Sequence, residues 1–164
     1  MASAEQAGTN VSGSVRRTIV AVKRSDVPNR VADKMGIRKG DVLFVDEAPT
    51  DALEAIELPA VTMSESLKGT FDHILFFVTT QAGMAARFAD LKQHLGPAGK
   101  LWVTWPKKGT LTTDLDLKHV ISIGYDHGLV ESTNLRIDDT WTSLKFTRPK
   151  PGKIYNNSYG KLTE

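Results

Sequence analysis

The sequence predicts an open, mostly parallel α/β sheet with helices on both faces, that is, a three-layer sandwich. Strand patterns alternate with helical patterns along the chain, which is typical of this class. Two of the strand segments, 71–78 and 101–105, are apolar on both faces, as expected for central parallel strands covered by helices on both sides. The chain of 164 residues, 40% of them hydrophobic, is long enough for one well-buried domain and short for two.

The first half of the chain carries short elements. Residues 1–15 offer almost no side chains to bury, so we expect a disordered N-terminal tail there. Pro28 stands early in a short helical pattern and Gly36 ends it. The elements expected in this half are an edge strand at 17–22, a helix at 28–35, a strand at 41–45, a helix at 51–58 and a weak strand at 60–63.

The second half carries clearer signals. An amphipathic helix follows the strand at 71–78, and the glycines and proline at 96–99 end it. Its apolar stripe consists of Met84, Phe88, Leu91 and Leu95. Thr113, followed three residues later by Asp116, resembles a capping box. The helix expected after it ends at Gly128 and carries on one face Leu117, Val120, Ile121 and Gly124.

Two strands close the fold. Segments 129–137 and 141–147 are joined at Asp138-Asp139, which predicts an antiparallel hairpin. A mostly parallel sheet with this ending is the variation shown by class I methyltransferase-like Rossmann folds, so we predict that architecture. Only about two dozen residues separate the strand at 41–45 from the strand at 71–78, so the N-terminal half is expected to be reduced. We assign 16–148 to one domain and 149–164 to a flexible or surface-lying tail.

In such a sheet, ligands bind outside the carboxyl ends of the strands, near the point where strand order reverses. Three loops are expected to meet there, one after each of the core strands. The candidate ligand-binding residues that they supply are Asp46, Thr79, Thr80, Gln81, Trp105, Lys107 and Lys108. The segment Trp105-Pro106-Lys107-Lys108 is the most distinctive of the three, because it joins an aromatic side chain to two cations.

The loop after the strand at 41–45 argues against a nucleotide cofactor. A dinucleotide or S-adenosylmethionine pocket favours a glycine-rich turn there, so that the backbone can approach the ligand. Residues 45–51 contain no glycine and three acids, and the acids would repel a pyrophosphate. We therefore expect no cofactor. Asp46 or Glu47 could instead hold a ribose or an amine, or cap the helix at 51–58.

An anion is the other ligand considered for this edge. The helix expected after Thr80 has no acid in its first turn, whereas the next helix opens with Asp114 and Asp116. A bound anion is therefore expected at the backbone N–H groups of the first helix, with Lys107 or Lys108 closing over it. The alternative is that both lysines are simply solvated.

The tryptophans extend the candidate surface. By the period of two, Trp102 and Trp105 point to opposite faces of their strand. Trp102 is expected in the core, and Trp105 either in the core or lining a pocket. In the last strand, Trp141 and Lys145 share one face, so they either pack under a helix or form a surface patch. We include both as candidate ligand-binding residues.

The sequence contains no motif or composition typical of several functional classes. The chain has no cysteine and a net charge of only +2, so there is no thiol chemistry and no strong field for nucleic acid or membrane. The four histidines have no metal-ligand spacing, and no catalytic motif is present, so we assign no metal and no catalytic residue. No signal-peptide core or membrane-length apolar run occurs, and a cytoplasmic location is expected.

The sequence resembles a small bacterial methyltransferase-like family of unknown function with the pattern L-W-V-S-W-P-K-K … D … G-L-V-D … D-E-T-W-S-G-L-K. The matching stretches are 101–108, 113–114, 128–130 and 138–146. The resemblance covers roughly residues 37–148 and is strongest from Phe71 onward. Thr104 and Asp139 are among the few departures from the pattern. The resemblance implies a Rossmann-like fold without an established activity, and it supplies no catalytic residue.

The sequence is consistent with three functions. The first is a non-catalytic, methyltransferase-like domain that binds a partner protein or a small anionic ligand. The second is a degenerate transferase that uses S-adenosylmethionine in a rebuilt pocket. The third is a weak nucleic-acid-binding module, suggested by aromatic side chains beside lysines. Saturable binding of S-adenosylmethionine would separate the second from the first, and steep salt dependence would mark the third.

Overall fold

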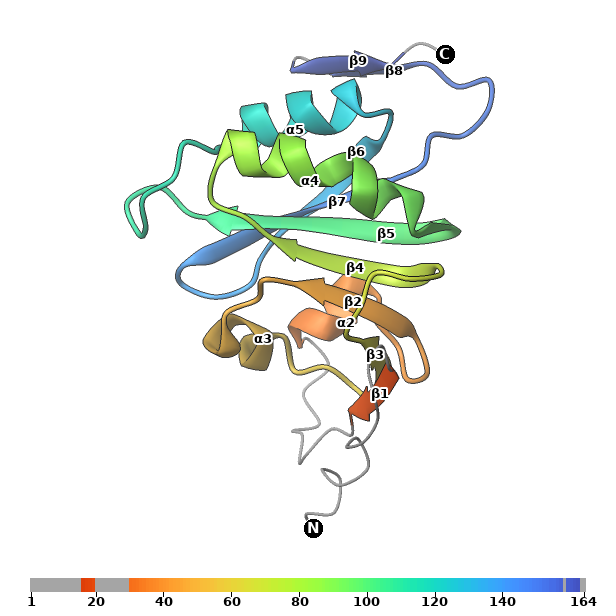
Figure 1. Cartoon of the computed structure of the whole chain (residues 1–164). Helices are drawn as coiled ribbons and strands as arrows, with labels where there is room; N and C mark the ends of the chain where they lie inside the picture. The colour runs from red at the N-terminus through yellow and green to blue at the C-terminus, as the bar shows by residue number, and fades with distance from the viewer. Residues whose placement is uncertain (1–15, 20–29, 158, 163–164) are drawn as a thin grey trace.

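The computed structural model describes residues 16–19, 30–157 and 159–162 (Figure 1). Its elements, in chain order, are β1 (Arg16–Ile19), α2 (Val31–Met35), β2 (Val42–Asp46), α3 (Thr50–Ile56), β3 (Val61–Ser64), β4 (Phe71–Phe77), α4 (Gln81–Gln93), β5 (Leu95–Pro106), α5 (Leu117–Asp126), β6 (Val130–Arg136), β7 (Trp141–Thr147), β8 (Tyr155–Asn157) and β9 (Gly160–Leu162).

Seven strands form one sheet in the order β1-β3-β2-β4-β5-β7-β6. The central strands β3, β2, β4 and β5 pair in parallel, whereas β7 runs antiparallel between β5 and β6. β1 lies antiparallel beside β3 at the opposite edge. The predicted α/β sheet, parallel in its centre and ending in an antiparallel hairpin, is confirmed. Its N-terminal half is reduced, because only α3 and β3 lie between β2 and β4.

Helices cover both faces of the sheet (Figure 1). The face under α4 and α5, here called the α4/α5 face, has an apolar core that includes Phe88, Val103 and Phe146. The opposite α2/α3 face has a second core, which includes Leu43, Leu75 and residues of both short helices. Apolar residues of β4 and β5 alternate between the two cores, as the two-sided apolar pattern of these strands predicts.

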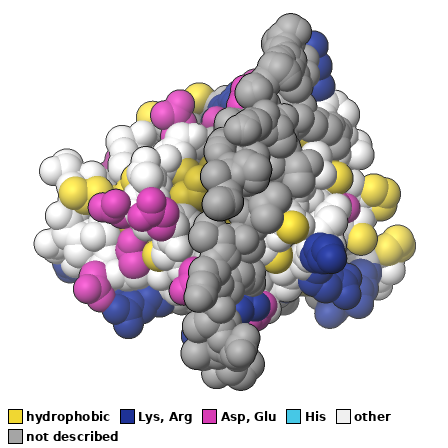
Figure 2. Space-filling model, turned by 90° about the horizontal axis from the view of Figure 1, so that it is seen from below, with side chains coloured by type: hydrophobic (Ala, Val, Ile, Leu, Met, Phe, Trp, Pro, Cys, Tyr) yellow, Lys and Arg dark blue, Asp and Glu magenta, His cyan; other side chains and the backbone are white. Residues whose placement is uncertain are grey.

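The surface seen from the side of α2 and α3 carries side chains of both charges. Figure 2 views the molecule from the side of α2 and α3, with acidic side chains gathered at the left and Lys and Arg side chains at several separate places. α3 contributes exposed Asp51 and Glu54, and Glu57, its C-cap, is also exposed. The visible described atoms thus show no extended basic surface, in keeping with the small net charge of +2.

One element boundary differs from the expectation. The strand predicted to begin at Leu101 begins at Leu95, directly after α4, and its register with β4 shifts between Phe71 and His73. Gly99 lies in the irregular part of β5, where an added Cβ would be only 2.9 Å from the Phe71 carbonyl oxygen. The glycines and proline at 96–99 therefore shape an irregular strand, rather than a loop between helix and strand.

The start of α5 also differs from the expectation. Asp116, not Thr113, is the N-cap, and its carboxylate accepts the His119 N–H at 3.0 Å. The Thr113 hydroxyl instead donates to the Thr79 carbonyl oxygen at 2.7 Å. Leu117, expected on the buried face, is 40% exposed because it is the first residue of the helix. The capping-box prediction was therefore wrong, although an aspartate cap is present.

The C-terminal segment adds a feature that the sequence did not predict. Strands β8 and β9 form a separate two-stranded antiparallel sheet, which lies over α5 (Figure 1). The tail expected at 1–15 lies outside the described residues. Among the described residues, no helix is long and apolar enough to cross a membrane.

Candidate functional site

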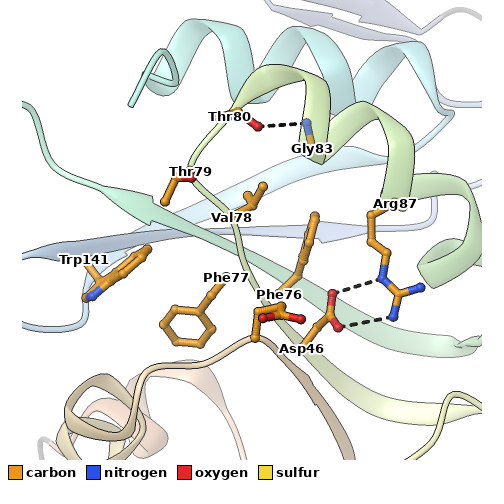
Figure 3. Close-up of a pocket in the computed structure, with 10 residues that line it drawn as sticks. Asp46, Phe76, Phe77, Val78, Thr79, Thr80, Gly83, Arg87 and Trp141 are labelled. Atoms are coloured by element: carbon orange, nitrogen blue, oxygen red, sulfur yellow. Dashed lines mark hydrogen bonds and ion pairs between the residues drawn. The ribbon is translucent and has the colours of Figure 1, made fainter. Parts of the chain in front are cut away.

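A cavity of about 490 Å³ opens at the carboxyl ends of β2 and β4. We call it the β2–β4 cavity (Figure 3). Its position is where this class of sheet binds ligands, and its size falls within the roughly 300–1,000 Å³ of small-molecule sites. The residues that line it are Asp46, Glu47, Phe76, Phe77, Val78, Thr79, Thr80, Gly83, Arg87 and Trp141.

An ion pair forms one wall of the cavity. Arg87 on α4 donates from Nε and Nη2 to the two carboxylate oxygens of Asp46, at 3.0 and 3.2 Å (Figure 3). The pKa of Arg87 is raised, chiefly by its hydrogen bond to Asp46. The Asp46 side chain is only 12% exposed, so the bidentate pair fixes both side chains in place. The end of β2 is thereby tied to α4.

Glu47 follows in the turn after β2. It adopts a left-handed backbone conformation, with φ of 59°, which non-glycine residues rarely adopt. Its side chain is exposed and has no salt-bridge or hydrogen-bond partner in the described part of the chain. Neither Asp46 nor Glu47 caps α3, whose N-cap is Pro49 without a side-chain hydrogen bond. The helix-cap interpretation of these acids was wrong, since Asp46 is engaged by Arg87.

The start of α4 lines another part of the cavity. Thr80 is the N-cap, and its hydroxyl accepts the Gly83 N–H at 2.9 Å. The Gln81 N–H donates to the carboxylate of Asp114 at 2.8 Å, and the Gln81 amide donates to the Asp114 carbonyl oxygen at 2.8 Å. From the sequence we expect a bound anion at this helix start. In the structure, Asp114 and the Thr80 hydroxyl already use these donors.

Aromatic side chains form the apolar wall. Trp141 at the start of β7 contacts Phe77 at the end of β4 edge-to-face, with ring centroids 5.3 Å apart. Trp141 is 7% exposed and belongs to the core of the α2/α3 face. Figure 3 shows both rings on the side of the cavity opposite Arg87. The cavity thus combines an aromatic wall with a charged one.

The Trp105-Pro106-Lys107-Lys108 segment lines a different recess. A groove of about 280 Å³, here called the Trp105 groove, lies between the end of β5, the start of α5 and the β6–β7 hairpin. Trp105 pairs with Thr142 and Pro106 pairs with Trp141, and successive residues of a strand point to opposite faces. Trp105 therefore faces the α4/α5 core and Trp141 the α2/α3 core. The expected single site is divided between two separate recesses.

The predicted ligand residues fall into three groups. Asp46, Thr79, Thr80 and Trp141 line the β2–β4 cavity, whereas Trp105, Lys107 and Lys108 line the Trp105 groove. Two residues line neither of these recesses. Gln81 is held by Asp114, and Lys145 places its Nζ 5.8 Å from the centre of the Trp102 ring. The pKa of Lys145 is lowered, first by burial and then by Lys100.

Arg87 is the cavity residue that the sequence reasoning missed. Thr80, Gly83 and Arg87 are spaced at i, i+3 and i+7, which places them on one face of α4. That spacing, together with the acids after β2 that need a counter-ion, could have identified Arg87 as a cavity residue. Among the described residues, no cluster of His, Asp or Glu could hold a metal ion.

No protein-family model matches the sequence, and no curated protein matches it. Several solved structures are similar to it in fold. Magnesium protoporphyrin IX methyltransferase (ChlM) from Synechocystis PCC 6803, with bound SAH, has a TM-score of 0.47 and 12% identity over 73% of this chain and 78% of that chain.

The second is a TehB-like SAM-dependent methyltransferase from Corynebacterium glutamicum, with a TM-score of 0.45 and 11% identity over 72% of this chain and 85% of that chain. The third is a methyltransferase from Pyrococcus furiosus, with a TM-score of 0.44 and 17% identity over 71% and 79% of the two chains. At this level of similarity, the architecture rests on the strand order and pairing of the chain itself.

Proposed function

We propose that this chain is a methyltransferase-like domain that binds a small ligand in the β2–β4 cavity and transfers no methyl group. A neutral or cationic ligand with an aromatic or apolar body suits the lining best. Phe77 and Trp141 supply an aromatic wall, and aromatic faces favour stacking and cations. The pairing of Asp46 with Arg87 leaves Glu47 as the unpaired charge of the lining.

The observation that carries the proposal is the Asp46–Arg87 ion pair at the end of β2. A bound S-adenosylmethionine requires the backbone after this strand to approach the ligand closely, which glycines permit. Here the turn carries side chains at every position, and the pair bridges the gap between β2 and α4. The residues present therefore do not fit that cofactor in its usual place, and we derive no step through it.

The cavity lining does not favour a small anion. Two first-turn donors of α4, the Gln81 and Gly83 N–H groups, are used by Asp114 and Thr80. The Arg87 guanidinium is paired with Asp46. A further anion would meet the free carboxylate of Glu47. The ligand of this cavity is therefore neutral or cationic, and not the small anion expected from the sequence.

A transferase using S-adenosylmethionine is the second candidate. It is favoured by the position of the cavity beyond the carboxyl ends of the parallel strands, and by an unpaired acid that would attract the cationic sulfonium. Isothermal calorimetry of the full chain with S-adenosylmethionine and S-adenosylhomocysteine separates the two candidates. We expect no saturable heat up to millimolar ligand. Micromolar saturable binding would replace the first candidate by the second.

A nucleic-acid-binding module loses its main support. Trp105 is 4% exposed and packs in the α4/α5 core, so it offers far less surface than the exposed aromatic platforms on which bases stack. The lysines beside it then lack the aromatic platform on which that interpretation depended.

The ligand class is tested with a matched pair of small probes. NMR spectra of the ¹⁵N-labelled chain are recorded with phenethylamine and with 3-phenylpropionate, which differ mainly in the sign of their charge. The amine is expected to shift the Trp141 indole and Thr79 amide signals at lower concentration than the acid does. Glu47→Gln should reduce this preference, because it removes the unpaired charge while keeping the side-chain shape.

The matched control is Glu54→Gln, which removes an exposed acid of α3 that does not line the cavity. It should leave the preference for the amine unchanged. Equal shifts by both probes, or an equal loss of preference in Glu47→Gln and Glu54→Gln, would refute the assignment of a cation-accepting cavity.

A further inference from the structure

The Trp105 groove holds two cations without a counter-ion. Lys107 and Lys108 both line it, and no carboxylate lies within ion-pair distance of either lysine in the described part of the chain. The β2–β4 cavity is the opposite case, because its arginine is neutralised by Asp46. The charge of the groove is therefore available to a molecule from outside.

The lysines stand on an ordered turn rather than on a loose loop. The Lys107 N–H donates to the Thr140 carbonyl oxygen at 2.7 Å, and the Thr110 N–H donates back to the Lys107 carbonyl oxygen at 3.1 Å. The Thr110 hydroxyl also donates to Lys107 O at 2.6 Å. Gly109 occupies a left-handed position with φ of 87°, which a tight turn of this kind requires. The turn presents both lysines at a fixed place beside Trp105.

The groove contains one acid, and that acid is already engaged. Asp116 caps α5 and accepts hydrogen bonds from the His119 N–H and from His119 Nδ1, at 3.0 and 2.6 Å. Burial is the largest single influence on the pKa of Asp116 and raises it. The hydrogen bonds from His119 together outweigh burial, so the pKa of Asp116 is lowered. With two lysines and one aspartate, the lining carries one net positive charge.

The rest of the lining is apolar or hydrogen-bonding. Trp105 and Leu115 form a buried floor, and Leu117 is 40% exposed at the rim. The volume of about 280 Å³ lies below the roughly 300–1,000 Å³ of sites that enclose a whole small molecule. Space of this size suits one or two side chains of a peptide that continues across the surface.

We propose that the Trp105 groove binds an acidic peptide segment of a partner protein, with an apolar side chain against Trp105 and Leu117 and a neighbouring carboxylate on Lys107 or Lys108. Charge complementarity selects the acid, since two unpaired ammonium groups gain charge-assisted hydrogen bonds to carboxylates. The exposed leucine and the buried indole beneath it select the apolar side chain. The proposal does not depend on the β2–β4 cavity, which is lined by a different set of residues.

The test uses two pools of capped hexapeptides added to the ¹⁵N-labelled full chain. One pool alternates Asp or Glu with Leu, Ile or Phe, and the other has Lys in place of the acids. The acidic pool should shift the Trp105 indole and the amides of 107–110, whereas the basic pool should not. Lys107→Ala/Lys108→Ala should weaken binding of the acidic pool at least about tenfold, which is about 1.4 kcal/mol. Leu117→Asn should weaken it as well.

The matched control is Lys118→Ala, an exposed lysine next to Leu117 that does not line the groove. It should bind the acidic pool as the parent chain does. The variants alter exposed side chains and the half-buried Lys107. Their free energies of unfolding should lie within about 0.5 kcal/mol of that of the parent, so a loss of binding reports the contact itself.

Three results would overturn the proposal. The first is equal binding of both pools, or an equal loss in Lys118→Ala. The second is tighter binding of a dT12 oligonucleotide with steep salt dependence, which would identify nucleic acid as the ligand. The third is a dimer in sedimentation that dissociates in Lys107→Ala/Lys108→Ala, which would identify a second copy of the chain as the occupant.

Discussion

The two faces of the sheet are held by different kinds of contact. The α4/α5 face is filled by apolar side chains that fit one another closely, as where the Phe88 and Phe146 rings meet edge-to-face at 5.7 Å. The α2/α3 face also buries polar groups, namely His73, Thr104 and Ser143. Alternation along the strands places these three on the same face as Leu75, Phe77 and Trp102.

This difference has a physical consequence. An apolar core is sensitive to shape, because even one added methyl group must displace its neighbours. A buried polar group is costly unless it is paired, and its cost can change with pH. On the α2/α3 face, His73 Nδ1 and Trp102 Nε1 are buried without a hydrogen-bond partner in the described part of the chain. We therefore expect the stability of the α4/α5 face to be most sensitive to changes in side-chain volume. That of the α2/α3 face should be most sensitive to changes in the ionisation of buried groups.

The largest effect is expected from Gly124→Ala on α5. An added Cβ would lie 2.1 Å from Cε1 of Phe146, so the ring or the helix must move. Alanine normally stabilises a helix interior by up to about 1 kcal/mol relative to glycine, but the clash should reverse the sign. We expect a loss of about 3 kcal/mol in the free energy of unfolding, the upper part of the range for overpacking, measured by urea denaturation.

Ser122→Ala on the same helix is the control, since Ser122 is not buried. It should change the stability by less than about 0.5 kcal/mol. A Gly124→Ala protein as stable as its parent would show that the α4/α5 core can rearrange around an added methyl group. That result would contradict the expectation that this face is the one sensitive to packing.

The second effect is a pH dependence that arises from His73. Its side chain is 2% exposed, with Nε2 3.3 Å from Asp41 Oδ2. Burial lowers the pKa of His73 from the ordinary 6.5 to about 4, against the opposing attraction of Asp41. Between these values the unfolded chain binds more protons than the folded one, so stability is lost as the pH falls from 6.5 toward 4. We expect a loss of about 2 kcal/mol between pH 7 and pH 5.

Denaturation curves at the two pH values, with and without His73→Gln, measure this effect. The variant has no group that titrates at this position, so its stability should change less between pH 7 and pH 5 than that of the parent. NMR provides a second check, because the His73 ring signals should not titrate above pH 5. A ring that titrates near pH 6.5 in the folded chain would contradict the prediction.

The smallest effect concerns the buried hydroxyl pair of the α2/α3 face. Thr104 Oγ1 and Ser143 Oγ lie 2.9 Å apart across β5 and β7. Ser143→Ala leaves the Thr104 hydroxyl without this partner and should cost about 1 kcal/mol. Thr104→Val/Ser143→Ala replaces both partners and should cost less than the single change, because no buried hydroxyl is left unpaired. Equal or additive losses in the double variant would show that the pair does not act as a unit.

Much of the fold could be predicted from local patterns. The runs 71–78 and 101–105, apolar on both faces, predicted β4 and β5, because strands covered by helices on both sides are apolar throughout. The spacing of Met84, Phe88 and Leu91 predicted α4, because a buried helix face imposes its period on the sequence. The boundary at Leu95 and the cap of α5 were not predicted correctly. Each depends on a neighbour distant in the chain, namely the Phe71 carbonyl group and the Thr79 carbonyl group that binds Thr113.

The candidate site was predicted less completely. Strand order placed the right loops at the carboxyl edge, but the sequence could not show that Asp114 occupies the start of α4 or that Arg87 neutralises Asp46. Both partners are more than thirty positions away in the chain. Ion pairs and caps of this kind depend on where charged side chains meet in space, and no local pattern encodes that meeting.

The sequence by itself determined the class of sheet, its terminal hairpin and the absence of a glycine-rich cofactor turn, because each is a property of consecutive residues. Only the tertiary structure decided which charges are free. It paired Asp46 with Arg87 and hydrogen-bonded Asp114 to Gln81, whereas Glu47, Lys107 and Lys108 have no ion-pair partner among the described residues. It also separated Trp105 from Trp141 on opposite faces. The physical reason is that burial and pairing depend on neighbours in space, and the sheet brings these together from distant parts of the chain.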